Sequence, residues 1–250
     1  MTEDITANPE CEAQTTTPAR ERRINTLIRG LKARRYLEVG VFKGVTFLHA
    51  DVEHKTGVDP LFRFDKSLAD KPGVTLCEVE SDTYFSTLAV QEKFDFIYLD
   101  GLHTFEQTYR DLTNALLHSH DRTVILIDDT LPSDVYSAIP DQALCLRRRK
   151  EAGGTGNAWH GDVFKTIFAL HDFHPGLDYR TIVGSGNPQT PIWRSSKGWR
   201  KPQFNCLEAI SRLSYFDMLK HRNILRKASE QDAIAACLAD LSELLPAADS

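Results

Sequence analysis

The sequence predicts an α/β protein with a doubly wound, mostly parallel sheet of seven strands, followed by C-terminal helices. Two observations predict this class. Short apolar runs alternate with helix-length segments from residue 35 to residue 195, as in chains whose parallel strands are joined by helices. The runs at 96–99 (FIYL) and 124–127 (VILI) are continuously apolar, which is typical of strands buried on both faces.

The elements follow in order. Residues 1–19, rich in Thr, Glu and Pro, predict a disordered tail, and the apolar spacing over 20–34 predicts a helix. A strand at 35–41 and a helix near 46–52 come next. Further strands are predicted at 55–59, 74–81, 94–100, 123–129, 179–183 and 191–195, with a helix at 163–171. The main domain therefore spans 20–200, and a helical extension spans 201–250, where Leu207, Ile210 and Leu213 set one helix face.

Composition limits which partners and which cellular compartment we expect for the protein. The formal net charge is −5, so no basic field gathers nucleic acid or an acidic membrane. No apolar run is long enough to cross a bilayer, and the N-terminus has no apolar leader. The five cysteines are scattered, which indicates reduced thiols. We expect a cytoplasmic protein without nucleic-acid or membrane partners, and leave open a homo-oligomer.

The first strand ends in a glycine-containing turn, Glu38-x-Gly40-x-x-x-Gly44, that leads toward a helix. Glycine is needed where the backbone approaches a ligand closely or takes a positive φ. The spacing is not the G-x-G-x-x-G of dinucleotide enzymes. Asp59, at the end of the next strand, lies where an acidic residue meets ribose hydroxyls. Alternatively, Asp59 forms a turn before Pro60. The preceding glycine turn favours the first interpretation, in which Asp59 binds a ligand.

Together with Ser81 and Asp82 after the third strand, these residues form a pattern that resembles that of class I S-adenosylmethionine-dependent methyltransferases. The resemblance covers residues 20–196. The resemblance implies the Rossmann-like methyltransferase fold for the main domain. It also implies that Glu38, Gly40 and Gly44 face the methionine end of the cofactor, that Asp59 holds its ribose, and that Ser81 and Asp82 flank its adenine. A Ser-Asp pair is also a common helix cap.

Carboxylates follow two neighbouring strands. Asp100 follows the fourth strand, and Asp128 and Asp129 follow the fifth. In the usual strand order these residues converge on one crevice, where only a cation offsets their repulsion. Oxygen ligands favour Mg²⁺, Mn²⁺ or Ca²⁺ over zinc. The alternative reading makes each Asp a cap or turn former.

The same residues resemble the metal-dependent O-methyltransferases of the catechol and macrolide-sugar types. That resemblance implies Asp100, Asp128 and Asp129 as metal ligands, with Asp100 also in the catalytic set. The catechol-type enzymes carry a lysine base three residues after the first Asp, and here that position is His103. We therefore expect His103 to act as the base on a small hydroxylated acceptor, with a surface or core histidine as the alternative.

Two other functions remain open: a non-catalytic S-adenosylmethionine-binding protein and a nicotinamide-dependent oxidoreductase. The missing third glycine of the dinucleotide turn disfavours the oxidoreductase. The acceptor itself stays open among sugars, polyketides and phenols.

The segment after Pro132 is predicted to be irregular, with a mobile, glycine-rich lid over 147–161. Trp159 is a candidate for stacking on the substrate, and His160 or Asp162 for reaching the metal, although a helix N-cap is favoured for Asp162. The arginine run at 147–149 is interpreted as a solvated face rather than an anion site. Asp111 is interpreted as structural.

Overall fold

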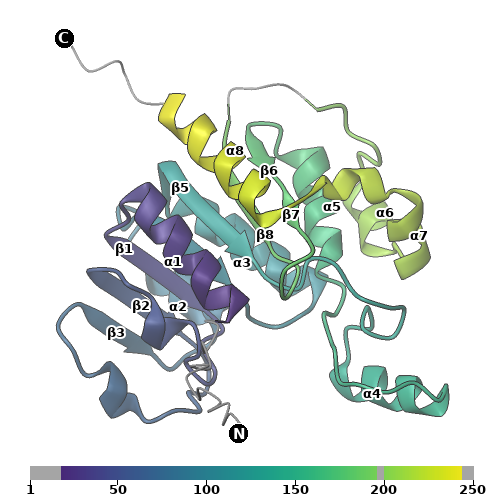
Figure 1. Cartoon of the computed structure of the whole chain (residues 1–250), viewed down its shortest axis with the longest axis horizontal. Helices are drawn as coiled ribbons and strands as arrows, with labels where there is room; N and C mark the ends of the chain where they lie inside the picture. Colours follow the sequence, from purple (N-terminus) through teal and green to yellow (C-terminus); the bar gives the residue numbers. More distant parts are fainter. Residues whose placement is uncertain (1–17, 196–199, 244–250) are drawn as a thin grey trace, which may run out of the picture.

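The structure, a computed structural model, describes residues 18–195 and 200–243; nearly all of the predicted 1–19 tail lies outside these residues. A seven-stranded sheet has the strand order β3-β2-β1-β4-β5-β8-β6 (Figure 1). Strand β8 runs antiparallel to both of its neighbours, and the other strands are parallel to one another. The predicted fold class is confirmed. The strands are β1 (Arg35–Val39), β2 (His54–Val58), β3 (Val74–Cys77), β4 (Phe94–Leu99), β5 (Ser119–Ile127), β6 (Leu177–Tyr179) and β8 (Thr190–Arg194).

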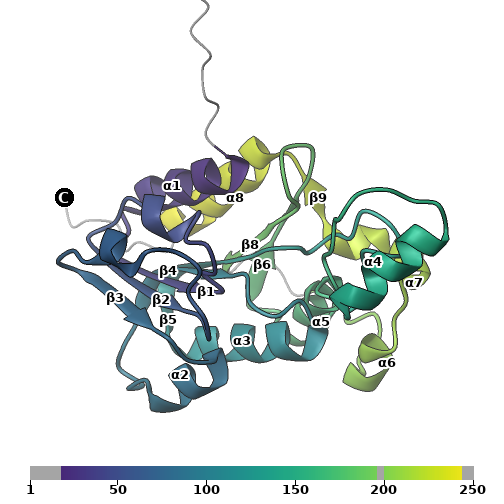
Figure 2. The ribbon, with the colours of Figure 1, turned by 90° about the horizontal axis from the view of Figure 1, so that it is seen from below.

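Helices cover both faces of this sheet, and Figure 2 shows the two helical layers on either side. Helices α1 (Ala19–Leu31) and α8 (Glu230–Glu243) lie on one face, while α2 (Ser81–Thr87), α3 (Phe105–Leu117) and α5 (Phe164–Phe173) lie on the other. Four shorter helical segments complete this part of the fold: η2 (Lys66–Ala69), α6 (Leu207–Ser211), α7 (Tyr215–Lys220) and η3 (Arg222–Leu225). No helix within the described ranges is both long and apolar enough to span a membrane.

Side chains that alternate along the central strands divide the hydrophobic core into two layers. Leu37, Ile97 and Ile125 face α2, α3 and α5, whereas Tyr36 and Phe96 face α1 and α8. Because successive side chains of a strand point to opposite faces, each strand contributes to both layers. The carboxyl ends of β1, β4 and β5 are thereby held in register at one edge of the sheet.

The predicted helix at 46–52 is wrong: the structure forms only the short 3-10 turn η1 (Phe47–His49). Lys55 explains the difference. Its ammonium group donates to the backbone carbonyls of Phe47, Leu48 and Ala50, at 2.7, 3.2 and 3.1 Å. Those carbonyls are engaged by a side chain instead of by the amides of a following helical turn.

Two further predictions need correction. The segment after Pro132 contains a helix, α4 (Gln142–Glu151), which stands away from the sheet in Figure 1 and includes residues 147–149. The strand predicted at 179–183 is two strands. Its first residue ends β6 in the main sheet, whereas β7 (Thr181–Ile182) pairs with β9 (Lys227–Ala228) in a separate two-stranded sheet.

The C-terminal helices pack on the sheet and on its helices. Helix α8 contacts α1 and β8, and the Trp193 indole donates to Asp240 at 2.9 Å. In α6, Ile210 is fully buried, whereas Leu207 at the start of the helix is exposed. The helical character predicted for 201–250 is confirmed where the structure describes it, through α6, α7 and α8.

Candidate functional site

A cavity of about 720 Å³ opens at the carboxyl ends of β1, β2 and β4. It lies where the strand order reverses between β1 and β4, which is where open α/β sheets bind their ligands. Its volume is within the range of small-molecule sites. Seven residues predicted for the site line it: Gly40, Asp59, Ser81, Asp82, Asp100, His103 and Trp159.

Gly40 allows two loops to meet at the base of the cavity. Its φ of +90° is unfavourable for other residues, and an added Cβ atom would lie 1.9 Å from the backbone oxygen of Asp100. The Asp100 amide in turn donates to the Val39 carbonyl at 2.8 Å. Glycine at this position is therefore required for the loop after β1 to pack against the loop that carries Asp100.

Glu38 is fully buried and does not line the cavity. Its buried carboxyl group accepts hydrogen bonds from the hydroxyls of Tyr36, at 2.6 Å, and Thr46. Burial raises the pKa of Glu38 to about 8, even though both hydrogen bonds oppose this shift. Gly44, with φ +72°, packs against Leu48 and is also absent from the lining. In this arrangement Glu38 and Gly44 shape the turn from below.

Asp59 is held by two backbone amides at the cavity wall. Its Oδ2 accepts from the Phe42 amide and its Oδ1 from the Leu61 amide, both at 2.8 Å. The carboxylate thus closes the loop after β1 onto the end of β2. Each oxygen keeps a further lone pair, so the group can still accept from hydroxyls in the cavity.

Ser81 and Asp82 form a polar cluster at the other wall. The Gln107 amide nitrogen lies 3.1 Å from Ser81 Oγ, from Asp82 Oδ1 and from Asp111 Oδ1. The structure thus gives Asp111 a partner on its own helix, as its structural interpretation requires. Ser81 is the first residue of α2 rather than the end of β3, because β3 stops at Cys77.

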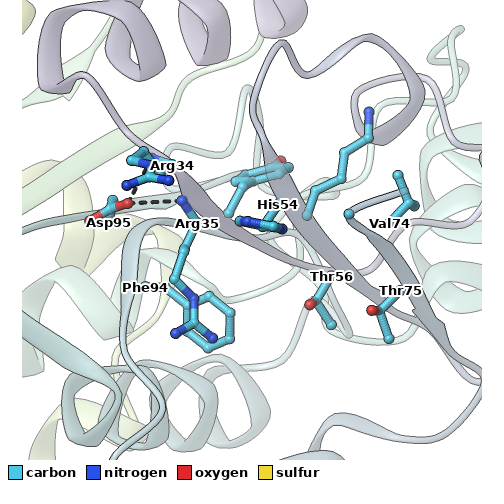
Figure 3. A pocket seen from close by; sticks show the side chains of 11 residues that line it. Arg34, Arg35, His54, Thr56, Val74, Thr75, Phe94 and Asp95 are labelled. Carbon is cyan, nitrogen blue, oxygen red and sulfur yellow. Dashed lines mark hydrogen bonds between the residues drawn. The ribbon is translucent and has the colours of Figure 1, made fainter. Parts of the chain in front are cut away.

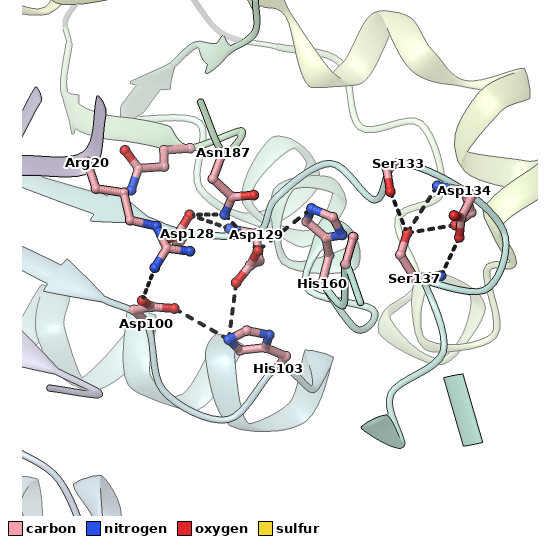
Figure 4. A network of polar contacts seen from close by, with 12 residues as sticks. Arg20, Asp100, His103, Asp128, Asp129, Ser133, Asp134, Ser137, His160 and Asn187 are labelled. Carbon is pink, nitrogen blue, oxygen red and sulfur yellow. Dashed lines mark hydrogen bonds and ion pairs between the residues drawn. The ribbon is translucent and has the colours of Figure 1, made fainter. Parts of the chain in front are cut away.

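Asp100, His103 and Asp129 converge in the arrangement shown in Figure 4. Each offers an atom within 4.8 Å of the other two, a spacing suited to a shared metal ion. The His103 Nε2 atom lies 3.4 Å from Asp100 Oδ1 and 3.1 Å from Asp129 Oδ2. Asp129 Oδ2 is buried and has no hydrogen-bond partner of acceptable geometry, which is costly unless a further ligand meets it.

Asp128, also predicted as a metal ligand, is not part of this group. Its Oδ2 accepts from Tyr98 Oη at 2.5 Å and from Arg20 Nε at 2.8 Å. Its Oδ1 accepts from Asn187 Nδ2 at 2.6 Å and from the Asp129 amide at 2.9 Å. Four donors therefore occupy this buried carboxylate, and it presents no free oxygen to an ion.

Arg20 and Asn187 are site residues that the sequence analysis missed. Arg20 enters from α1, with Nη1 3.3 Å from Asp100 Oδ2 and Nε on Asp128. Asn187 Nδ2 donates to both Asp128 Oδ1 and Asp129 Oδ1, the latter at 2.7 Å. Both residues are far from their partners in sequence, and no local motif marks them.

The carboxylates control the charge of His103. Burial alone lowers the pKa of this imidazole, but the hydrogen bond to Asp100 and the charges of Asp129, Asp100 and Asp128 raise it to about 9. Burial and the charge of Asp128 raise the pKa values of Asp100 and Asp129. In the absence of a cation, the two carboxylates therefore favour the protonated form of His103.

The segment after α4 packs on His103 from the other side. The Trp159 ring stacks on the imidazole, and the His160 Nε2 atom lies 3.9 Å from Asp129 Oδ1. Asp162 does not cap the helix that follows it. Its carboxylate accepts from the Phe105 amide at the start of α3 and from Lys165, both at 2.7 Å.

The arginine run is not a uniformly solvated face. Arg149 is 4% exposed and donates to the Ala158 carbonyl at 2.7 Å and to Asp134 at 3.2 Å. Residues 147 and 148 are exposed. Arg149 thus ties the end of the glycine-rich segment to the loop before α4.

A second concavity, of about 670 Å³, lies at the amino ends of β1 to β4 (Figure 3). Its charged groups already have partners. The Arg34 and Arg35 amides donate to Asp95 at 2.7 and 2.8 Å, and Arg34 also pairs with Glu53. It lies at the opposite end of the sheet from the candidate site and lacks unpartnered catalytic groups among the residues described.

Residues 37–130 match the model of a family described as "Methyltransferase domain". Among solved structures, the chain is similar to a protein from Klebsiella pneumoniae assigned as an O-methyltransferase, with 19% identity and a TM-score of 0.50 over 73% of this chain and 82% of that one. It is also similar to cofactor-bound Rv0187 from MTB, with 18% identity and a TM-score of 0.50 over 72% and 82% of the two chains. No curated protein gives a significant match.

The two structures share the α/β fold of this chain, and the family match covers most of β1 and all of β2 to β5. Residues 37–130 are thus similar in sequence to a methyltransferase domain.

Proposed function

We propose that the chain transfers a methyl group from S-adenosylmethionine to a hydroxyl of a small molecule, assisted by a divalent cation at Asp100 and Asp129. The observation that carries the proposal is the buried Asp129 Oδ2, which lacks a hydrogen-bond partner and lies 3.1 Å from His103 Nε2, next to a cavity that Asp100 and His103 line. Two carboxylates, one of which has a buried oxygen without a hydrogen-bond partner, suit Mg²⁺, which prefers oxygen ligands. The donor set therefore fits such an ion.

The cofactor residues support the same proposal. Gly40, Asp59, Ser81 and Asp82 line one cavity with Asp100 and His103, so a cofactor in that cavity lies beside the carboxylates. We propose Asp59 for the ribose hydroxyls and Ser81 and Asp82 for the adenine side. Glu38 and Gly44 hold the turn from beneath, without direct contact.

In this proposal the bound cofactor would supply an electrophilic methyl group and leave as S-adenosylhomocysteine, and a cation held by Asp100 and Asp129 would lower the pKa of the acceptor hydroxyl. His103 accepts the hydroxyl proton at Nε2. Asp100 and Asp129 flank that atom and stabilise the imidazolium that forms. The cavity walls hold the acceptor in line with the methyl group, which is the main contribution that a protein makes to such a displacement.

A second assignment makes His103 a third metal ligand, and it is favoured by the position of Nε2 between the two carboxylates. Substitution of His103 distinguishes the role of base from the role of metal ligand. If His103 is the base, His103→Ala lowers the rate by about 10²- to 10⁴-fold and leaves Mn²⁺ affinity unchanged. If it is a ligand, Mn²⁺ affinity falls together with the rate.

The metal requirement is tested with a panel of hydroxylated acceptors under chelation. We expect chelator to abolish turnover and Mg²⁺ to restore it, while calorimetry shows nearly unchanged cofactor affinity. Asp129→Asn should lose activity and Mn²⁺ binding together. Full turnover in chelator would exclude metal assistance. Cofactor binding without transfer to any acceptor would favour a non-catalytic cofactor-binding protein.

A further inference from the structure

Arg20 reaches the carboxylates from a different element than the ones that carry them. It lies in the first turn of α1, whereas Asp100, Asp128 and Asp129 follow β4 and β5. Its guanidinium group bridges Asp128, at 2.8 Å from Nε, and Asp100, at 3.3 Å from Nη1. Arg20 also lines the cavity, so the bridge lies at the wall of the proposed site.

The Arg20 bridge separates Asp128 from the other two carboxylates. Asp128 is saturated by Arg20, Tyr98, Asn187 and a backbone amide. Asp100 faces Arg20 with Oδ2 and His103 with Oδ1. Only the Asp100–Asp129 side then keeps an oxygen without a hydrogen-bond partner, Asp129 Oδ2.

We propose that Arg20 is a resident counter-ion which confines a divalent cation to the Asp100–Asp129 side and weakens its binding. This inference rests on the proposed function for the presence of that cation. Arg20 is a positioning residue here, because it acts through the carboxylates and not on the reacting atoms.

Charge explains both parts of the inference. Three carboxylates carry three negative charges, which one guanidinium and one divalent ion together balance. Removing Arg20 leaves an excess negative charge beside the ion and frees Asp128 Oδ2 from its charged partner. Unit charges a few ångströms apart near a protein surface interact by more than the free energy of a tenfold change in affinity. A divalent ion should therefore bind more tightly without Arg20.

The neighbouring Arg22 provides a matched control. It lies two residues away on the same helix and pairs with Glu230 at 3.0 Å, away from the cavity. Arg22→Ala removes the same charge from α1 without touching Asp100 or Asp128. Arg20→Lys keeps the charge but loses the fork that spans both carboxylates.

Mn²⁺ titration by calorimetry or electron paramagnetic resonance tests the inference on the full chain without any acceptor. We expect Arg20→Ala to bind Mn²⁺ at least tenfold more tightly than the wild-type protein, Arg22→Ala to match wild type, and Arg20→Lys to lie between. Thermal unfolding of each variant checks the fold. If Arg20→Ala does not fold, Arg20→Gln and Arg20→Lys give the same comparison.

Unchanged or weaker Mn²⁺ binding in Arg20→Ala would overturn the inference. Absence of Mn²⁺ binding in both proteins would also overturn it. If Mn²⁺ binds only after Arg20 is removed, the counter-ion role holds and metal assistance of the wild-type enzyme fails. The activity of the wild-type enzyme in chelator tests the proposed function separately.

Discussion

The indole of Trp159 stacks on the imidazole of His103, with ring centroids 4.5 Å apart and planes inclined by 23°. Gly161 closes the same side of His103, since a Cβ atom there would lie 1.7 Å from the His103 carbonyl oxygen. The Trp159 indole nitrogen is fixed by the Ile139 carbonyl at 2.8 Å. The imidazole is thereby packed against the Trp159 ring, and its Nε2 atom lies near Asp100 and Asp129.

Loss of the stacked ring should slow methyl transfer. Aromatic pairs of this kind contribute about 0.5–1.5 kcal/mol beyond their buried area. We therefore expect Trp159→Leu to lower kcat by about two- to tenfold, because His103 loses its orientation, while Trp159→Phe retains most of the rate. Steady-state kinetics with saturating acceptor measures this effect. A change confined to KM would instead assign Trp159 to acceptor contact.

Asp59→Ala should weaken cofactor binding by about 1–3 kcal/mol, the size expected for lost hydrogen bonds to a charged group. Calorimetry with S-adenosylhomocysteine measures the affinity. The Phe42 and Leu61 amides also lose their acceptor, so thermal unfolding is measured in parallel. Asp121→Ala, at the exposed amino end of β5, serves as the control. Unchanged affinity in Asp59→Ala would remove this residue from the ribose.

Glu38 should make stability depend on pH. Its pKa rises from 4.5 to about 8 on folding, because the carboxyl group is buried. The folded protein therefore holds a proton that the unfolded chain releases, so the free energy of unfolding falls as pH rises from about 4.5 to about 8. Glu38→Gln should flatten this part of the profile in denaturant titrations. Glu53→Gln, a surface control, should not, and an identical profile in both variants would contradict the prediction.

The segment at 147–161 should become less accessible when cofactor and acceptor bind, as a lid does. The structure indicates which part of this segment is free to move. Arg149 and Trp159 are anchored at its ends, while Gly153 and Gly156 have positive φ and open space around the position of a Cβ atom. Limited proteolysis should therefore cut between 150 and 157 in the free protein and slow with ligands. Equal cutting in both states would indicate a passive connection.

Most of the fold could be predicted because hydrophobic patterning carries it. The apolar runs of β4 and β5 identify buried parallel strands, and their adjacency places Asp100 beside the carboxylates that follow β5. Helix α4 escaped prediction because it has little apolar face: its buried residues are Cys145 and Arg149. In η1, the contacts of Lys55 outweigh a helical pattern that spans only a few residues.

The site was harder to predict than the fold. Asp128 and Asp129 are adjacent and chemically equal in the sequence. In the structure, Asp129 takes φ +58°, a conformation that Asp tolerates, and turns its carboxylate toward His103 while Asp128 turns toward Arg20. The Arg20–Asp100 contact spans 80 residues and depends on how α1 packs, which no local pattern encodes.

Arg20 and Asn187 lie on opposite sides of the region that matches the methyltransferase family, residues 37–130. The matched region supplies Asp100, His103 and Asp129, and the flanking segments supply the groups that orient and neutralise them. A chain trimmed to the family boundaries would keep the potential ligands but lose Arg20 and Asn187. Exchanging these flanking segments between relatives therefore offers a way to change the charge around the candidate site without altering any residue of the matched region.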